Sequence, residues 1–336
     1  MITPEDVYAA KEKAHTEDGQ FYRWLGASLI GHPCSRYVAL KFRCAFHDQF
    51  SGKLLRMFEV GHDAEDRIIR DMHATGKVYI GDQQKMIDLP GAKGHAGVTL
   101  DGIALVDSER MVDRERMVWE CKTANDDTFK KFEKQGVKAA KPQYYAQVQV
   151  GMMLTNLKHA LHTTENKNTS ALRFEVIPYN HEVAENLASL ARRIVEGFEG
   201  QRCNDRPDWY ECKWCPANKM CHGSAIPRKH CLTCCHSTAV DGGKWACRIF
   251  GDAIIPNKNL SVGCDDHLYL PWMLNFCMRG YGEYWVEYEL PGGERFYNLP
   301  VSSFPKITGV DNPVLLTSEM MEQAGDVTRI TAEGKA

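Results

Sequence analysis

The sequence has 336 residues, of which 43% are hydrophobic and 25% are charged, a globular composition with room for two domains or for one domain with an appendage. The formal net charge of -3 gives no overall attraction to nucleic acid, so DNA binding would need a local basic patch. No apolar run approaches the roughly 20 residues that cross a bilayer. The N-terminal residues are polar and acidic, unlike a secretory signal. We therefore expect a cytoplasmic protein without a membrane partner.

The N-terminal part is predicted to be mainly helical. A first helix is expected over residues 3–15, followed by a turn around Gly and Pro that carries Cys34. A longer helix is predicted over residues 51–75, because its apolar residues recur every three and four positions. Glu65 and His62 lie one turn apart on a face of this helix that is otherwise apolar. A half-buried glutamate needs a partner, for which a metal ion and an i, i+3 contact in solvent are the alternatives.

Two apolar strands separated by a charged turn are predicted at the centre of the first half. The first strand, residues 98–106, carries Asp101, and the second, residues 117–122, contains Glu120 and Lys122. Because side chains alternate along a strand with period two, the two carboxylates and the amine can face the same side. The pattern therefore predicts a cluster of acidic and basic groups at one place.

Such a cluster has a definite chemistry. Two carboxylates from neighbouring strands hold Mg²⁺ or Mn²⁺ through oxygen ligands, and the carbonyl of Cys121 is a candidate third ligand. A lysine beside the ion orients or helps to deprotonate a water, and the ion stabilises charge on a phosphate under attack. A charged hairpin in solvent can also contain this pattern of residues by chance, so the interpretation depends on the surrounding sequence.

Further helices and strands are predicted after this cluster. We expect strands within 77–90, helices over 128–135 and 141–155 on either side of Gly136, strands near 158–163 and 171–178, and a helix over 181–199 capped by Asn180. Five lysines follow the cluster: Lys130, Lys131, Lys134, Lys138 and Lys141. They are typical of a solvated helix face, but their place beside the carboxylates favours contact with phosphates.

This order of elements predicts an α/β fold with a mixed central sheet flanked by helices. Four motifs, GHDAE, LDG, ECK and AQVQ, resemble in order and spacing those of the PD-(D/E)xK nuclease superfamily, in its RecB-like and lambda-exonuclease-like branch. The resemblance covers about residues 20–225. It implies a restriction-endonuclease-like fold and a nuclease that uses Mg²⁺ or Mn²⁺.

The resemblance also implies a role for each matching residue. The implied metal ligands are Glu65 on the helix and the carboxylates of Asp101 and Glu120. Lys122 corresponds to the catalytic lysine, and Gln147 to the glutamine of a QxxxY-type motif. These five residues are therefore the candidate catalytic set.

Two positions depart from the family pattern. Gly151 stands where many members carry the tyrosine of the QxxxY motif, which leaves the contact with the DNA end open. Cys121 occupies the middle of the ECK triplet, and neither departure removes a metal ligand. Gln147 and Gln149 lie within an apolar helix, where a buried amide must find hydrogen bonds from the backbone or from a ligand.

Thirteen cysteines in a cytoplasmic chain indicate metal sites more than disulfides, because that compartment keeps thiols reduced. Cys212, Cys215 and Cys221 have the spacing C-x2-C-x5-C, and Cys34 is the candidate fourth ligand. The arrangement resembles the iron-sulfur nucleases of the AddB type and of CRISPR adaptation. It implies a 4Fe-4S cluster that joins the N-terminal and C-terminal parts of the nuclease. Zinc is the competing occupant, since four thiolates hold it equally well.

A second group of cysteines follows in a turn-rich segment: Cys231, Cys234, Cys247 and Cys264. Their spacing predicts a small zinc-ribbon-like module, which has too few apolar residues to fold without a metal. Other residues are alternative ligands: Cys235, His236 and His267. The set of four is therefore open at this point.

We expect three domains. These are a nuclease domain with its iron-sulfur site over residues 1–225, a zinc-ribbon-like module over 226–275 and a C-terminal hairpin with a tail over 276–336. Two runs with alternating apolar residues, 284–290 and 294–299, predict the hairpin. Polar residues from about 318 onward are expected to be mobile.

The combined features predict a metal-dependent exonuclease that acts on linear DNA ends, in recombination or end resection in a bacterium or a phage-infected cell. A single-strand annealing protein is a candidate partner, by analogy alone. The alternatives are a CRISPR-adaptation-type iron-sulfur nuclease, against which the appended zinc module weighs, and a non-catalytic DNA-binding scaffold subunit. The sequence specifies neither polarity nor strand preference, and an oligomer stays open.

Overall fold

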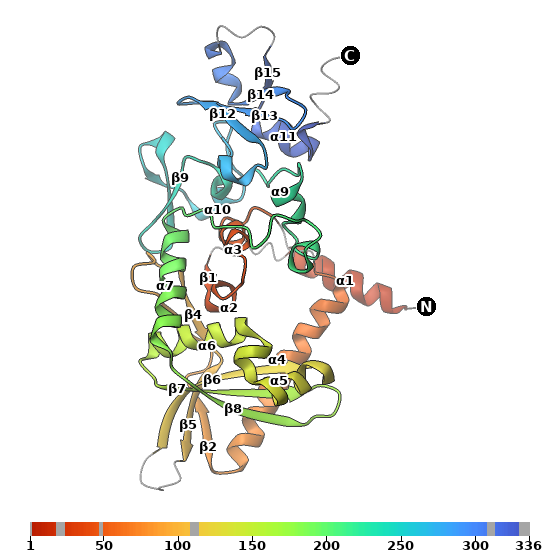
Figure 1. Cartoon of the computed structure of the whole chain (residues 1–336), viewed down its shortest axis with the longest axis vertical. Coiled ribbons are helices and arrows are strands. Elements are labelled where there is room, and N and C mark those ends of the chain that lie inside the picture. The colour runs from red at the N-terminus through yellow and green to blue at the C-terminus, as the bar shows by residue number, and fades with distance from the viewer. Residues whose placement is uncertain (1, 18–23, 47–49, 108–113, 308–312, 329–336) are drawn as a thin grey trace. The chain divides into compact units, whose positions relative to one another are not determined.

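The computed structural model describes residues 2–17, 24–46, 50–107, 114–307 and 313–328, which form two compact units (Figure 1). The first unit lies within residues 1–20, 24–33 and 49–192, and the second within 21–23, 34–48 and 193–336. The three domains expected from the sequence stay a prediction. No helix in the described ranges is both long and apolar enough to cross a membrane.

A five-stranded sheet is the centre of the first unit. Its strands follow the order β2 (Val78–Gly81), β5 (Gly102–Asp107), β6 (Arg114–Ala124), β7 (His159–Asn166) and β8 (Leu172–Pro178). β6 and β7 are parallel, and the other neighbouring pairs are antiparallel. The predicted α/β fold with a mixed sheet is therefore confirmed at this level.

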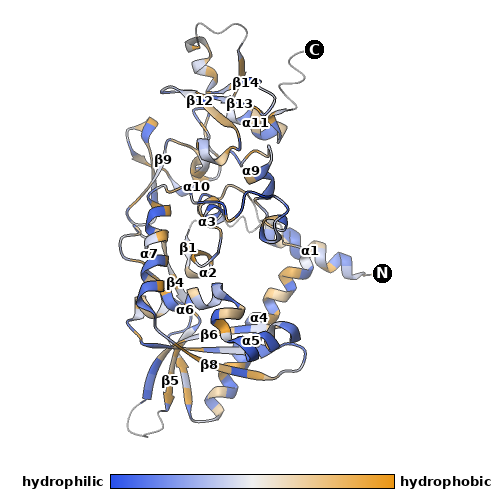
Figure 2. Ribbon diagram, viewed as in Figure 1, coloured by the Kyte–Doolittle hydropathy of each residue, from blue (hydrophilic) through white to orange (hydrophobic). Residues whose placement is uncertain are grey.

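Helices cover the two faces of this sheet (Figure 1). α4 (Gly52–Ala74) packs its buried Ile68 against Trp119 and Leu161, whereas α5 (Asp126–Ala140) and α6 (Pro142–Thr155) pack against Val118 on the opposite face. Neighbouring residues of β6 thus enter different cores, as the period of a strand requires. α4 and α7 (His181–Val195) alternate in hydropathy along their length (Figure 2), which is typical of helices with one buried face.

A smaller sheet corrects one sequence prediction. It contains β1 (Leu25–Gly26), β4 (Ala96–Leu100) and β3 (Lys85–Asp88), so the single strand expected over residues 98–106 is wrong. The chain bends at Asp101, and its two halves join different sheets. A β-carbon on Gly102 would lie 2.7 Å from Ile80 Cγ2, so glycine permits this close crossing. A continuous apolar run in the sequence does not indicate whether its residues form one strand or are divided between two sheets.

The remaining predicted elements of the first unit are present with small shifts. α1 covers Pro4–Glu17, and α7 ends at Val195 rather than at residue 199. The short helix α2 (Ala27–Ile30) was not predicted. The break at Gly136 within α5 is confirmed, because this residue has φ 72° and ψ 170°, outside helical geometry. Asn180 accepts a hydrogen bond from the backbone N–H of Val183 at 3.0 Å and so caps α7 as predicted.

The second unit contains short elements. Its α-helices are α3 (Ser35–Phe42), α8 (Tyr210–Lys213), α9 (Asn218–His222), α10 (Asn257–Leu260) and α11 (Ser318–Ala324), and its 3-10 helices cover Cys231–Thr233, Arg248–Phe250, Pro271–Met273 and Val301–Lys306. One sheet contains β9 (Ser237–Val240), β10 (Lys244–Cys247) and β11 (Ala253–Ile254). Another contains β12 (Cys277–Tyr281), β13 (Val286–Glu289), β14 (Arg295–Asn298) and β15 (Val314–Leu316).

Two sequence predictions fall in this last sheet and beyond it. The hairpin is confirmed as the antiparallel pair β13 and β14. The mobile end expected from about residue 318 is wrong at its start, because α11 forms there with Thr317 as its cap and Met321 buried in the core.

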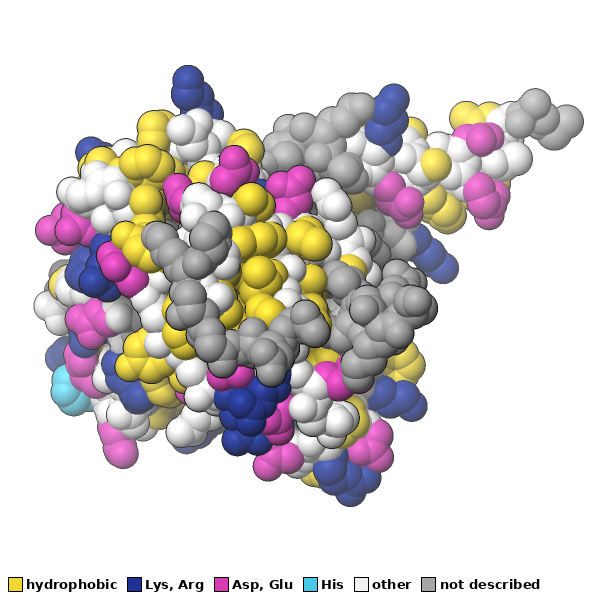
Figure 3. Space-filling view, turned by 90° about the horizontal axis from the view of Figure 1, so that it is seen from above, with side chains coloured by type: hydrophobic (Ala, Val, Ile, Leu, Met, Phe, Trp, Pro, Cys, Tyr) yellow, Lys and Arg dark blue, Asp and Glu magenta, His cyan; other side chains and the backbone are white. Residues whose placement is uncertain are grey.

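The face shown in Figure 3 has basic side chains interspersed with acidic ones, in keeping with the small net charge.

Two glycine substitutions test the crossing at Asp101. We expect Gly102→Ala to lower the free energy of unfolding by about 1–3 kcal/mol, because the added methyl group meets Ile80 and the carbonyl of Gly81. Gly61→Ala in α4 is the matched control, because nothing lies within 4 Å of its added β-carbon. That variant should gain about 0.5–1 kcal/mol from helix propensity. Urea unfolding measures the free energy of unfolding of both variants. Equal effects of the two substitutions would contradict the close crossing at Gly102.

Candidate active site

Strand β6 places an acid and a base side by side in the interior of the first unit. Glu120 is 2% exposed, and its carboxylate forms an ion pair with the ammonium group of Lys122 two residues later. Lys122 Nζ also lies 3.6 Å from Asp101 Oδ2 and donates a hydrogen bond of 3.0 Å to the carbonyl of Cys121. One ammonium group is therefore shared by two carboxylates and a carbonyl.

Asp101 reaches this cluster from the bend between β4 and β5. Its Oδ2 accepts a hydrogen bond of 2.9 Å from the backbone N–H of Cys121, which fixes the carboxylate against β6. The three residues thus come together as the sequence predicted, but by a different route. Asp101 is positioned by the bend rather than by alternation within one strand.

Glu65 approaches from helix α4. Its side chain is half-buried, and its Oε1 is buried without a hydrogen-bond partner among the described residues. Burial, and then the nearby carboxylate of Asp101, raise the pKa of Glu65 to about 7, although Lys122 opposes the shift. His62, predicted on the same face, is exposed.

Three carboxylates, of which Glu120 is buried and the other two are half-buried, surround one ammonium group. Burial raises the pKa of Glu120 to about 8, with Asp101 and Glu65 adding to the shift and Lys122 opposing it. Burial alone would lower the pKa of Lys122, but Glu120 and Asp101 outweigh it, so the pKa of Lys122 is raised. Lys122 therefore stays protonated, and the cluster favours additional positive charge.

Two aromatic residues that the sequence did not single out complete the surroundings of Lys122. The ring centroid of Tyr144, on α6, lies 5.7 Å from Lys122 Nζ and 6.2 Å from the ring of His162 on β7. His162 is fully buried, and burial, then Lys122 and Arg173, lower its pKa to about 3, so its imidazole is neutral. The available signals were one helical turn between Tyr144 and Gln147 and a histidine within a predicted strand.

The glutamines of α6 behave differently from each other. Gln149 Nε2 donates to the carbonyl of Pro178 at 3.0 Å, and its Oε1 accepts from the N–H of Asn180 at 2.7 Å, so this amide is structural. Gln147 is buried, with 8% of its surface exposed. Gly151 lies in the core, where its β-carbon would meet Val118 at 3.3 Å.

The lysines that follow the cluster belong to α5 and its C-terminal end. All five are exposed: Lys130, Lys131, Lys134, Lys138 and Lys141. Lys130 pairs with Asp126 at 2.6 Å, and Lys138 lies 5.3 Å from the ring of Tyr145. Their exposure agrees with both alternatives considered from the sequence, a solvated helix face and a contact with phosphates.

The first cysteine group comes together in the second unit. Cys34 precedes the first residue of α3 without a side-chain capping hydrogen bond, Cys212 lies in α8, and Cys221 lies in α9. Burial, and then Cys34 and Cys212, raise the pKa of Cys215. Cys203, not among the predicted ligands, lies 3.7 Å from Cys212, sulfur to sulfur. Burial, then Cys34 and Cys212, raise the pKa of Cys203 to about 12.

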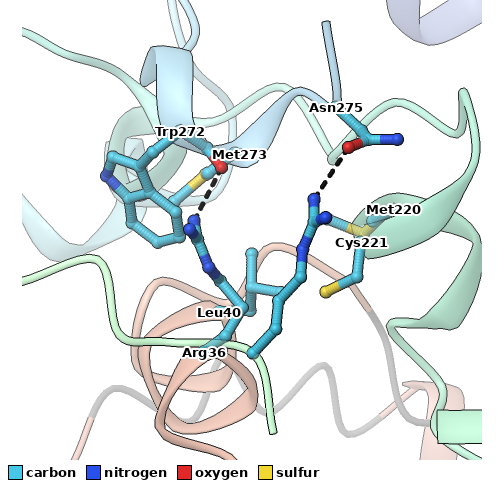
Figure 4. Close-up of a pocket in the computed structure, with 8 residues that line it drawn as sticks. Arg36, Leu40, Met220, Cys221, Trp272, Met273 and Asn275 are labelled. Carbon is cyan, nitrogen blue, oxygen red and sulfur yellow. Dashed lines mark hydrogen bonds between the residues drawn. The ribbon is translucent and has the colours of Figure 1, made fainter. Parts of the chain in front are cut away.

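Two arginines accompany this group. Arg36 Nη1 donates to the carbonyl of Trp272 at 2.8 Å, and Arg202 Nη2 donates to Asn275 Oδ1 at 2.7 Å (Figure 4). Burial raises the pKa of Cys221 to about 11, and both arginines act against this increase. Their positive charge favours thiolates at this end of the group.

The second cysteine group also comes together. Burial, followed by the electrostatic effect of Cys234, Cys264 and Cys247, raises the pKa of Cys231 to about 11. Among the alternative ligands, Cys235 hydrogen-bonds with Cys234, and His267 Nε2 lies 3.1 Å from the carbonyl of His230. His236 is buried.

Within the described residues, no three His, Cys, Asp or Glu side chains are arranged to hold a metal ion directly. The acidic cluster nevertheless fits a cation. Glu65 has a buried oxygen without a hydrogen-bond partner among the described residues. Burial first, and then the neighbouring carboxylates, raise the pKa values of Glu65 and Glu120, so a positive charge at this place would stabilise both ionised groups. All three carboxylates supply the hard oxygen donors that Mg²⁺ and Mn²⁺ prefer.

No protein-family model matches the chain, and no curated protein matches its sequence. Among solved structures, LHK-Exo in complex with dAMP aligns with TM-score 0.38 and 16% identity over 57% of this chain and 90% of that chain. The alkaline exonuclease LHK-Exo from Laribacter hongkongensis aligns with TM-score 0.39, 16% identity and the same coverage. SSO0001 aligns with TM-score 0.39 and 14% identity over 63% of this chain and 91% of that chain. TM-scores this low carry no argument about this chain.

The raised pKa of Glu65 predicts a pH-dependent effect of Glu65→Gln in buffer without Mg²⁺ or Mn²⁺. The folded-state pKa of about 7 exceeds the ordinary 4.5, so the wild type loses stability as the pH rises between these values. Glutamine does not ionise. The variant should match the wild type near pH 4.5 and exceed it by about 1–2 kcal/mol above pH 7, allowing for solvent screening of the half-exposed carboxylate.

Thermal and urea unfolding at several pH values check this prediction. Glu59→Gln is a control on the same helix, because Glu59 pairs with Lys11 and its pKa is lowered. It should bring no gain at high pH. An equal gain for both variants, or none for Glu65→Gln, would contradict the proposed environment of Glu65.

Proposed function

We propose that the protein is a DNA nuclease dependent on Mg²⁺ or Mn²⁺, and that it degrades linear DNA from its ends. The observation that carries this proposal is the convergence of Asp101, Glu120 and Lys122 through direct contacts, with Glu65 beside them. The resemblance of the motifs that contain these residues to PD-(D/E)xK nucleases adds the substrate class.

Asp101, Glu120 and Glu65 would hold the cation, with the carbonyl of Cys121 as a further oxygen donor. The bound cation supplies Lewis acidity toward a phosphate. The hydrogen bond from Cys121 N–H holds the Asp101 carboxylate in place. Lys122, kept protonated by its carboxylates, orients a water and stabilises developing negative charge.

Residues around the cluster would contact the DNA. The exposed lysines of α5 offer positive charge to the phosphate backbone. Gln147 corresponds to the glutamine of the QxxxY-type motif and is the candidate contact to the DNA end. Tyr144 lies against Lys122 and is the tyrosine of α6 best placed to substitute for the one that Gly151 replaces.

Anaerobically purified protein, incubated with end-labelled linear DNA or closed circular DNA and with Mg²⁺, Mn²⁺ or EDTA, tests this function. We expect degradation of linear DNA alone, only with a divalent cation. Lys122→Met should slow it by about 10²- to 10⁴-fold, because it removes the charge at constant length. Lys77→Met, at an exposed lysine of the same unit, is the control and should retain full activity.

Other results would assign another role. Cleavage of the circle would indicate an endonuclease of the CRISPR-adaptation kind. Binding of DNA without cleavage by wild type and Lys122→Met alike would contradict catalysis and favour a scaffold subunit. A single-strand annealing protein as partner is part of the proposal only in the exonuclease case.

We further propose that both cysteine groups hold metal. Cys34, Cys212, Cys215 and Cys221 would bind a 4Fe-4S cluster, with zinc as the competing occupant, and Cys203 adds a fifth sulfur there. Cys231, Cys234, Cys247 and Cys264 would bind zinc. Both would be structural, since they tie short elements of the second unit that have small cores of their own.

Metal analysis and visible absorption of variants test the cysteine sites. Cys212→Ser should lose about four iron atoms per chain, or one zinc if zinc occupies the site, and Cys231→Ser should lose about one zinc. Cys277→Ser is the control, because Cys277 is exposed and lies outside both groups. An unchanged metal content in the first two variants would contradict the proposed sites.

A further inference from the structure

Strand β8 exposes an apolar stripe at one edge of the five-stranded sheet. Its outer side has no partner strand among the described residues. Leu172, Phe174 and Val176 are 39%, 50% and 53% exposed, and their spacing of two places them on one face. Proteins usually protect such an edge with charge, a bulge or a covering element, because it otherwise pairs with another strand.

The backbone of the same three residues points outward. Tyr179 N donates to Lys158 O, and Asn166 N donates to Ala171 O, each at 2.9 Å. Hydrogen-bonded pairs alternate along an antiparallel ladder, so residues 173, 175 and 177 point their N–H and C=O groups toward β7. The N–H and C=O groups of residues 172, 174 and 176 consequently face away from the sheet.

We propose that β8 pairs with β8 of a second copy of this chain, antiparallel, about a two-fold axis at Phe174. In that register Phe174 faces its own counterpart, Leu172 faces Val176, and all three backbones meet as hydrogen-bonded pairs. Apolar side chains then cover one another across the junction. Each copy would extend the sheet of the other, so that ten strands run continuously.

The charges on the other face of β8 fit the same register. Arg173 and Glu175 alternate with the apolar residues, and within one copy they pair at 2.7 Å. Antiparallel pairing about Phe174 places Arg173 of each copy opposite Glu175 of the other, in the closer, non-hydrogen-bonded type of pair. The segment is thus complementary to itself in both apolar contact and charge.

Neighbouring registers fit less well. An axis at Leu172 places Phe174 opposite Ser170, which gives it no apolar partner. An axis at Val176 places Phe174 opposite Pro178, which has no N–H and whose carbonyl already accepts from Gln149 at 3.0 Å. The register about Phe174 is therefore the one that uses all three outward-facing residues. The inference does not depend on the proposed nuclease activity.

Sedimentation equilibrium of the whole protein at micromolar concentration tests the pairing. We expect a wild-type dimer, monomers for Phe174→Lys and Val176→Lys, and a dimer for Tyr79→Lys. Tyr79 is the control because it is also 50% exposed but lies on β2, the opposite edge of the sheet. A monomeric wild type, or a dimer that survives both β8 substitutions, would overturn the proposal.

A charge exchange separates loss of pairing from loss of folding. Arg173→Glu and Glu175→Arg should each weaken self-association by about tenfold or more, because each places like charges opposite one another. An equimolar mixture of the two variants should form heterodimers of near wild-type stability, since both cross-strand pairs are then attractive. Failure of the mixture to associate, while circular dichroism shows both variants folded, would overturn the register.

Discussion

A half-buried ammonium group shared between carboxylates is the interaction on which the first unit depends. Glu120 is buried and Lys122 is largely withdrawn from water, and an ion pair in such a place is stable only with close geometry and additional hydrogen bonds. The carbonyl of Cys121 and the carboxylate of Asp101 provide them. The bend at Asp101, the narrow crossing at Gly102 and the long strand β6 all serve this one arrangement.

The cluster contains more carboxylates than ammonium groups, and this imbalance determines which ligand it can bind. Three carboxylates surround one ammonium group, and burial, followed by the repulsion between the carboxylates, raises the pKa values of Glu65 and Glu120. The neutral His162 adds none, and Tyr144 supplies only the face of its ring. A divalent cation is the simplest group that would balance the site, and phosphodiester hydrolysis is the chemistry that such a cation and lysine support together.

The sequence predicted most helices and strands, but it did not predict features that depend on contacts between residues distant in the chain. Helix α4, which has regular apolar spacing, lies where its periodicity placed it, and α6 and β7 lie close to the ranges expected for them. The division of residues 98–106 between two sheets could not be predicted, because it follows from the space around Gly102. Tyr144, His162 and Cys203 were missed for a related reason, since their importance comes from neighbours that are distant in sequence or lie outside any recognised spacing.

A crystal structure of the protein grown with Mn²⁺ and a short DNA duplex, with anomalous scattering recorded at the manganese edge, tests directly whether this cluster binds a cation beside DNA. We expect an anomalous peak bounded by the carboxylates of Asp101 and Glu120, with Glu65 facing it and Lys122 Nζ turned toward a phosphate. A cluster that remains closed, with Lys122 still between Asp101 and Glu120 and no manganese bound, would contradict it.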